Sequence, residues 1–409
     1  MTLDLASSRV DSLELRYLNG TFAELCRIES PSGSERACAD RVIAELRALE
    51  VGVDEDDAGS RVDSDCGNLL ARIPASTRSD ALAAGGAPQA GGGPSPQPRC
   101  VLLCAHLDTV PLLAPVDPVL VDGHWENANE GVLGADNKAA IAVMLALARH
   151  VCREGSPLEL ELLFTVGEET ALAGARAFDA SRLRSEFGFV FDHASPIGEL
   201  VVDSPTHFRV EATFHGAAAH AGIRPELGRS AILAAAHAIS SLTVGRLDER
   251  TTLNVGTIDG GSAVNVVPER CSFVAEVRSL DEQRAEAVVG ELVERVHAAA
   301  NLPECECDVD VDVQRMFSGF HLPSTRPAVR AAEAALSACG YAPVRIASGG
   351  ASDANELIAR GLDVVNLANG TERNHEPGER VSVEALQRML DVALALLDAA
   401  AGAVAGAAR

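Results

Sequence analysis

The feature that most constrains the fold is a repeated alternation of short apolar runs with segments of helical periodicity. Residues 100–105, 159–166 and 187–191 form apolar runs of strand length, and residues 138–151 and 170–178 between them have a helical pattern. Strands that are apolar on both faces and alternate with helices are typical of a parallel sheet. The sequence therefore predicts an α/β fold with helices on both faces of a mostly parallel sheet.

A different order of elements interrupts this alternation after residue 205. Strands are predicted at 208–214, 252–258, 272–279 and 308–314, with helices at 228–242 and 281–299. The resulting order of strand, helix, two strands, helix and strand is that of a ferredoxin-like α+β sandwich. We therefore predict that residues 206–317 form an inserted domain.

The alternating pattern resumes after the insertion. Helices are predicted at 327–339, 354–360 and 382–400, and strands at 344–347 and 363–367. The first domain is thus expected to be discontinuous, made of residues 1–205 and 318–409. At 409 residues, the chain is long enough for two domains of ordinary size.

The N-terminal region is predicted to contain helices at 11–24 and 34–49 and a strand at 68–73, with a helix cap at Gly33-Ser34-Glu35. Residues 75–98 are rich in Gly, Pro, Ala and Ser. Such a segment buries too little apolar surface to offset its ordering entropy. We interpret it as a disordered loop on a hairpin that joins strands 68–73 and 100–105.

Charge and composition exclude several classes of function. The formal net charge of −25 argues against a nucleic-acid partner, because phosphate binding depends on clustered Lys and Arg. The first 19 residues lack the regions of a secretory signal, and no apolar stretch reaches transmembrane length. These features predict a cytoplasmic protein without a membrane partner, in which the ten cysteines are reduced.

Possible metal ligands follow the predicted strands, at the edge where the functional groups of an open parallel sheet gather. His106 and Asp108 come after the first apolar run, Glu168 and Glu169 after the second, and Asp192 after the third. A carboxylate two residues from an imidazole can hold one ring nitrogen while the other faces a metal. One of two adjacent glutamates can bind a metal while the other acts as a general base.

Two more candidates lie in loops. Asp136 begins a predicted helix after the turn at 131–135, and His375 follows the apolar run 364–368. Alone, Asp136 is explained as a helix cap and His375 as a surface residue. Together with the strand ends, they give two histidines and three carboxylates, a donor set that suits zinc, with cobalt or manganese as alternatives. Two metals that share a carboxylate are the natural interpretation.

An ordered set of motifs resembles the M20 metallopeptidase family. The motifs are CAHLDTVP, GVLGADNKAAIAVML, FTVGEETALAGA, VFDHASPIGELVVDSP, HGAAAHAGIRPELGRSAI, NVVPERCSFVAEVRSLD, SGGASDANELIARG and NGTERNHEPGERV. They occur in the order found in that family and span roughly residues 15–396. The ASPIGELVVDSP segment is most similar to the tripeptide aminopeptidase branch, also called peptidase T.

The resemblance implies roles for the metal site. It implies two Zn²⁺ per subunit, the first on His106, Asp136 and Asp192 and the second on Asp136, Glu169 and His375. Glu168 would be the general base and Asp108 the residue that orients His106. In similar proteins, the peptide bond after the bridging aspartate is cis.

The resemblance also implies a homodimer that forms through the inserted lid domain and acts on small peptides. His220 would reach the active site of the partner subunit as the donor to the oxyanion. Arg278 ends a predicted strand of the lid, where its guanidinium could bind the substrate carboxylate with help from Asn265, and a surface salt bridge explains it equally well. Gly349, Gly350 and Asp353 match a glycine-rich loop over the substrate backbone, although an ordinary turn explains them nearly as well. We interpret His193, His207 and His215 as structural.

Other functions remain open at this stage. An M20 carboxypeptidase or N-acyl amino acid deacylase would use the same metals, and the sequence does not determine which end of a peptide is held. A dimeric metal-binding scaffold that has lost catalysis is a remoter alternative. The chain contains no G-x-S-x-G elbow, Walker loop or HExxH motif, which argues against serine hydrolases, nucleotide hydrolases and HExxH metalloproteases.

Overall fold

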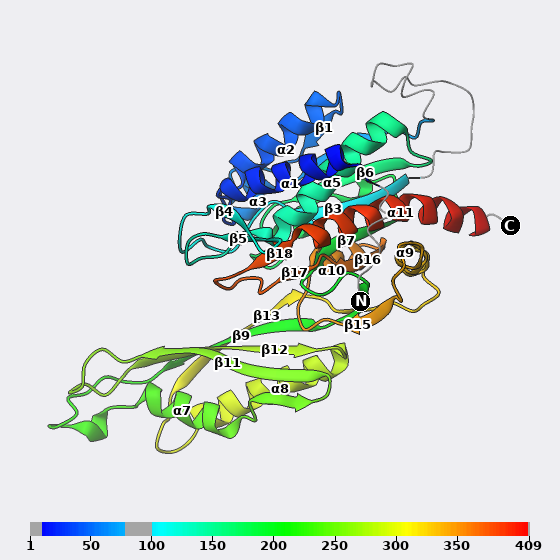
Figure 1. Ribbon diagram of the computed structural model, residues 1–409. Helices are drawn as coiled ribbons and strands as arrows, with labels where there is room; N and C mark the ends of the chain where they lie inside the picture. The colour runs from blue at the N-terminus through cyan, green and yellow to red at the C-terminus, as the bar shows by residue number, and fades with distance from the viewer. Residues whose placement is uncertain (1–9, 78–99, 408–409) are drawn as a thin grey trace. The chain divides into compact units, whose positions relative to one another are not determined.

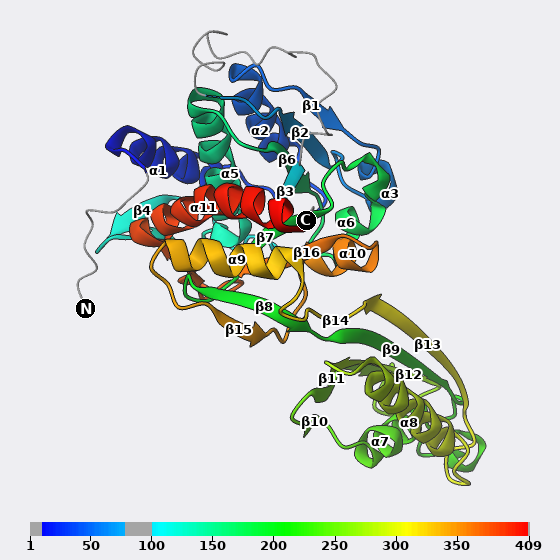
Figure 2. The same ribbon diagram turned by 90° about the vertical axis from the view of Figure 1, so that its right-hand side faces the viewer.

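The computed structural model of the chain describes residues 10–77 and 100–407, and it divides into two compact units. The first unit consists of Met1–Val202, Leu322–Ala347 and Ser352–Arg409. The second consists of Asp203–His321 and Ser348–Ala351. The chain therefore passes from the first unit into the second and returns, as the colour sequence in Figures 1 and 2 shows.

The large sheet of the first unit runs in the order β1-β2-β6-β3-β7-β16-β8, with β15 also paired to β8. Its strands are β1 (Val53–Glu55), β2 (Leu69–Ile73), β3 (Cys100–His106), β6 (Glu159–Thr165), β7 (Phe187–His193), β8 (Glu199–Ser204), β15 (Val344–Ala347) and β16 (Asp363–Ala368). The four central strands, β6, β3, β7 and β16, are parallel. All residues of β3, β6 and β16 are buried, so both faces of the sheet are covered.

Helices surround this sheet. They are α1 (Ser12–Arg27), α2 (Arg36–Ala48), α3 (Gly59–Val62), α5 (Ala135–Glu154), α6 (Ala173–Ala177), the 3₁₀ turn η2 (Ala180–Arg182), α9 (Pro327–Ala338), α10 (Asp353–Ala359) and α11 (Val383–Ala407). The helix α5 packs against β3 and β7, and α1 and α11 lie beside it (Figure 2). Fourteen residues of α5 are buried, which makes it the central helix of the unit. The predicted α/β fold with a mostly parallel sheet is confirmed.

A second, small antiparallel sheet in the first unit was not predicted. Its order is β17-β18-β5-β4, with β4 (Pro118–Val121), β5 (His124–Asn127), β17 (Thr371–Glu372) and β18 (Arg380–Ser382). Strands β17 and β18 flank residues 373–379, and β18 pairs with β5 in the register Val381↔Trp125. The sheet therefore fixes both ends of the loop that carries His375.

The second unit is built on an antiparallel sheet in the order β10-β11-β12-β9-β13. Its elements are β9 (Thr206–His215), the 3₁₀ turn η3 (Pro225–Leu227), α7 (Ala231–Ser241), β10 (Gly245–Asp248), β11 (Thr251–Gly260), β12 (Arg270–Ser279), α8 (Glu282–Ala300), β13 (Asp308–Phe317) and β14 (Phe320–His321). With β10 and β14 set aside, this is the predicted ferredoxin-like sandwich.

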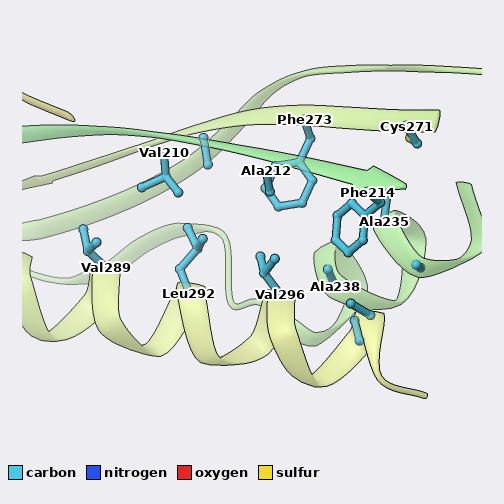
Figure 3. Packing of buried hydrophobic residues seen from close by; sticks show 14 of the residues in the cluster. Val210, Ala212, Phe214, Ala235, Ala238, Cys271, Phe273, Val289, Leu292 and Val296 are labelled. Atoms are coloured by element: carbon cyan, nitrogen blue, oxygen red, sulfur yellow. The ribbon is translucent and has the colours of Figure 1, made fainter. Parts of the chain in front are cut away.

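Strict alternation along β9 and β12 places one apolar face of this sheet against the two helices. Figure 3 shows Val289, Leu292 and Val296 of α8 pointing toward residues of the sheet, among them Val210 and Phe273. Ala235 and Ala238 of α7 complete this core, because their small side chains let the helix approach the sheet closely.

Some local predictions were wrong. Strands β2 and β3 do not form a hairpin, because β2 pairs antiparallel with β6, which lies between them. The predicted disorder of segment 75–98 falls largely on residues outside those described. Strands β8 and β10 were not predicted, and α6 is shorter than expected. Within residues 10–77 and 100–407, the structure has no helix with the length and apolarity needed to span a membrane.

Candidate metal centre

The parallel strands bring the predicted ligands to one edge of the large sheet. His106 is the last residue of β3 and pairs with Thr165, the last residue of β6. Glu168 and Glu169 follow this point within four residues, and Asp192 lies near the end of β7, the neighbour of β3 on its other side. The carboxyl ends of three strands therefore deliver four of the predicted residues to one place.

The first group of ligand atoms surrounds the imidazole of His106. Its Nε2 atom lies 3.3 Å from Oδ1 of Asp136 and 3.7 Å from Oδ1 of Asp192. Candidate ligand atoms from these three residues all lie within 4.8 Å of one another. This group consists of the three residues that were predicted to hold the first metal.

The second group surrounds the imidazole of His375. Its Nε2 atom lies 3.2 Å from Oδ2 of Asp136 and 2.9 Å from Oε1 of Glu169. These three residues also offer ligand atoms within 4.8 Å of one another. Asp136 thus turns one carboxylate oxygen toward each histidine, as a ligand shared by two cations does. The peptide bond Asp136-Asn137 is cis, as the resemblance implied.

The donor atoms of these groups fit metal ions. Among the residues that the structure describes, the buried atoms His106 Nε2, Asp136 Oδ1 and Glu169 Oε1 make no hydrogen bond of good geometry, and each lies close to another ligand-type atom instead. Buried polar atoms without partners are rare in proteins and require an explanation. A cation bound by nitrogen and oxygen ligands satisfies all three, and zinc accepts this donor set.

Asp108 contacts three of the residues at this centre and orients them. It is fully buried, with Oδ1 lying 3.3 Å from Nδ1 of His106, and the backbone carbonyl of Asp108 lies 3.0 Å from the same nitrogen. A proton on Nδ1 therefore leaves Nε2 free to face a cation. The two carboxylate oxygens also accept the backbone N–H groups of Glu168 (3.0 Å) and Glu169 (3.1 Å).

The histidines and carboxylates at the centre shift one another's pKa values. Burial disfavours the charged imidazole, but the nearby carboxylates of Asp108, Asp136 and Asp192 outweigh it and raise the pKa of His106 well above its usual range. Burial also opposes the charged form of Asp136, but hydrogen bonds from both histidines hold its pKa far below the usual range.

Other carboxylates at the centre compete for protons. Burial and the nearby Asp136 raise the pKa of Asp192 to about 7. Burial and then the charge of Asp192 raise the pKa of Glu168 well above its usual value. Such crowding of acids is offset when cations bind among them.

The structure places the other predicted residues as follows. In the second unit, Arg278 donates from Nη1 to the carbonyl of Gly349 (3.2 Å) and from Nη2 to Oε2 of Glu276 (3.1 Å). His220 and Asn265 lie together, because the N–H of Ala221 donates to the carbonyl of Asn265 (2.9 Å).

The remaining two predicted residues, Gly350 and Asp353, both accept hydrogen bonds from side chains. The carbonyl of Gly350, also in the second unit, accepts a hydrogen bond from the hydroxyl of Ser204 (3.0 Å). Asp353 lies in the first unit and is 1% exposed. Its Oδ2 accepts hydrogen bonds from Thr165 and Cys104. The side chain of Asp353 is thus held inside the protein, and its predicted contact with the substrate backbone stays a prediction.

Comparisons with known proteins identify two peptidase families and a full-length relative that resemble this chain. Residues 206–301 match the peptidase dimerisation domain of M20 enzymes, and residues 90–213 match peptidase family M28. The uncharacterized protein YqjE of Bacillus subtilis is 32% identical over 381 residues, which are 93% of this chain and 97% of that protein.

Two solved structures match almost the whole chain. The aminopeptidase PepT of Bacillus cereus is 32% identical, with a TM-score of 0.82, and the match covers 95% of this chain and 99% of that one. A tripeptidase of Staphylococcus aureus is 29% identical, with a TM-score of 0.85 and the same coverage. This chain belongs to the M20 peptidase family. It is a metallopeptidase of the PepT-like branch and therefore hydrolyses peptides.

Three residues that support the centre of this M20 peptidase were missed by the sequence analysis. Glu35 stands at the N-cap position of α2, as predicted, but its side chain makes no capping hydrogen bond. It is fully buried and accepts the N–H of Gly167 at 3.1 Å. The side-chain amide of Asn366 accepts the N–H of Asp192 and donates to its carbonyl, both at 2.9 Å.

The third missed residue is Glu379, which is 1% exposed and lies beside the start of α5. Burial raises its pKa to about 7. A glutamate four residues after a predicted metal ligand was the available signal. Its sequence context, however, also suits an exposed turn.

Proposed function

We propose that this M20 peptidase binds two zinc ions and releases the N-terminal residue of short peptides, with tripeptides as the preferred substrates. The observation that carries the proposal is the pair of ligand groups that share Asp136. The similarity to an aminopeptidase and a tripeptidase over nearly the whole length of each supports the substrate class.

The proposed ligands are those predicted from the sequence. His106, Asp136 and Asp192 would hold the first ion, and Asp136, Glu169 and His375 the second. When bound, a zinc pair supplies Lewis acidity and lowers the pKa of a coordinated water. Cobalt and manganese accept similar ligands and are the alternatives.

Glu168 is the proposed general base. It offers a ligand-type oxygen within 4.8 Å of candidate atoms of His106 and Glu169, yet it belongs to neither group that contains Asp136. From this position, its carboxylate can take a proton from the attacking water and return it to the leaving amine. Asp108 keeps both glutamates in place through their backbone N–H groups.

The second unit is proposed to complete the site. His220 would donate a hydrogen bond to the oxyanion in the active site of the partner subunit, which requires a homodimer, and the matched dimerisation domain supports this arrangement. Arg278, assisted by Asn265, would bind the substrate carboxylate, with Gly349 and Gly350 next to the substrate backbone.

Carboxypeptidase or N-acyl amino acid deacylase activity is the main alternative. A protein of Paracoccidioides lutzii named "Probable carboxypeptidase" is 30% identical over 326 residues, which cover 71% of this chain and 69% of that protein. A binding scaffold without catalysis is more remote, because all the proposed ligands and Glu168 are present.

The experiment that separates these functions compares three forms of one tripeptide: free, N-acetylated and C-terminally amidated. The aminopeptidase proposal predicts rapid release of the N-terminal residue from the free peptide and no cleavage of the acetylated form. Cleavage of the acetylated peptide alone would contradict it and support a carboxypeptidase or deacylase. If the zinc-loaded protein hydrolysed none of the three forms, the result would support a binding scaffold without catalysis.

A further inference from the structure

We propose that Glu379 is a positioning residue that holds the shared ligand Asp136 in place for metal binding. The inference rests on the proposed function, and it assigns a role to a residue outside both ligand groups. Oε2 of Glu379 accepts the backbone N–H groups of Leu133 and Gly134, each at 2.8 Å, and Oε1 accepts the N–H of Asp136 at 2.8 Å.

The three donors belong to the turn that leads into α5. The first N–H groups of a helix have no partner within the helix, so an acceptor must come from elsewhere. Gly134 has φ of 75°, in the left-handed region that favours glycine, and this conformation lets three N–H groups of the turn point to one side. A carboxylate suits these donors because it only accepts hydrogen bonds and has two oxygens.

Burial makes the interaction specific. Glu379 is 1% exposed, so an unsatisfied group at this place could not turn to solvent. Glutamine at the same position has one acceptor oxygen and one NH₂ donor. In either orientation, the NH₂ group would face a backbone N–H, which would displace the turn and with it the Asp136 side chain.

The position of Glu379 also links Asp136 to the second histidine ligand. Both Glu379 and His375 lie in the loop between β17 and β18. His375 contacts the side chain of Asp136 at 3.2 Å, while Glu379 contacts its backbone at 2.8 Å. One loop therefore holds the shared ligand from two sides, and its displacement would affect both metal sites.

Glu161 offers a matched control. It is fully buried, and its carboxylate accepts the backbone N–H groups of Arg184 and Ser185, each at 3.0 Å. It also accepts Nε of Arg72 at 2.8 Å. Glu161 lies in the first half of β6, however, whereas the candidate ligands follow the end of that strand. Replacement of either glutamate by glutamine removes a buried carboxylate that accepts backbone N–H groups, and in Glu161 it also removes the partner of Arg72.

The test measures Co²⁺ binding to the full-length metal-free proteins by titration, together with the visible absorption spectrum and the thermal unfolding midpoint. Partners that orient metal ligands contribute about 10- to 100-fold in metal affinity. Glu379→Gln is therefore expected to weaken Co²⁺ binding at least tenfold and to change the absorption spectrum. Glu161→Gln is expected to lower the unfolding midpoint but to keep the parent affinity and spectrum.

Four outcomes would contradict either the positioning role or the proposed function, and they can be told apart. If Glu379→Gln binds Co²⁺ with the parent affinity and spectrum, or if Glu161→Gln weakens binding equally, the positioning role is wrong while the proposed function stands. If the parent protein binds no Co²⁺, the proposed function itself fails. If Glu379→Gln does not fold, Glu379→Asp replaces it in the test, because its side chain is one methylene shorter and withdraws both oxygens from the turn. Glu379→Asp should then bind Co²⁺ more weakly than the parent. Parent-like binding by Glu379→Asp would overturn the inference.

Discussion

Nε2 of His375 lies 3.2 Å from Oδ2 of Asp136, although the two residues come from loops fixed by different parts of the fold. Asp136 stands at the start of α5, and His375 lies between two strands of the small sheet. His375 also has φ of 67°, which is uncommon for a residue other than glycine. The surrounding sheet must hold this backbone conformation, which directs the imidazole toward Asp136.

Glu168 and Glu169 are adjacent but are expected to respond differently to the same substitution. Glu168→Gln should keep both metals and lose about 100- to 10,000-fold in kcat, the usual contribution of a general base. Glu169→Gln should lose the second metal, because Glu169 belongs to the group with Asp136 and His375. Mass spectrometry of the intact proteins and peptide hydrolysis measure both effects. Equal metal loss in the two variants would contradict the assigned division of roles.

His220 is expected to act across the dimer. His220→Ala should lower kcat about 100- to 1,000-fold, as removal of an oxyanion donor does. When His220→Ala and Glu168→Gln dimers are mixed and allowed to exchange subunits, each hybrid should contain one intact site, so activity should reappear. If His220 served its own subunit, every site in the hybrid would lack one group and the mixture would stay inactive.

Arg278 is expected to recognise the substrate carboxylate. A charge-assisted hydrogen bond contributes about 1.5–3 kcal/mol, so Arg278→Gln should lower kcat/KM for a free tripeptide about 10- to 100-fold. The same substitution should have little effect on a C-terminally amidated tripeptide, which lacks the negative charge. An equal loss for both substrates would show that Arg278 has another role.

The stability of the second unit is expected to depend on the protonation of His207. Burial, assisted by the charge of Arg278, lowers the pKa of His207 to about 4, and the carboxylate of Glu276, with Oε2 3.3 Å from Nε2, opposes this shift only in part. In the unfolded chain, its pKa is about 6.5, so between these values the unfolded state binds the additional proton. The free energy of unfolding should therefore fall as the pH decreases from 6.5 toward 4, by on the order of 2 kcal/mol from this residue.

His207→Gln should remove most of that pH dependence. His215 is the control, because it lies on the same strand, is 41% exposed and contacts Asp310 at 3.0 Å. Denaturant unfolding at several pH values, followed by hydrogen exchange of β9, measures the effect in the full chain. A His207→Gln variant with the parent's pH dependence would show that the proton binds elsewhere.

The sequence allowed prediction of those features that depend on local patterns. The apolar runs identified β3, β6, β7 and β16, because strands buried on both faces have few polar residues. The strand ends then gave His106, Glu168, Glu169 and Asp192 without knowledge of the pairing.

The features that were missed depend on contacts between distant segments. Strands β17 and β18 have two and three residues, too few to show a period, and they form only because β5 pairs with β18. Glu35 was predicted only as part of a helix cap, and no role was predicted for Glu379. The roles of both depend on backbone N–H groups more than one hundred residues away in the chain, which no sequence window contains.

The most direct test of the shared carboxylate is the metal stoichiometry of the parent protein and of Asp136→Asn, measured by native mass spectrometry after loading with zinc. The account predicts two zinc ions per parent chain. It predicts that the variant retains fewer than one, since Asp136 contributes to both groups. Two ions in the variant, or a single ion in the parent, would contradict the central claim.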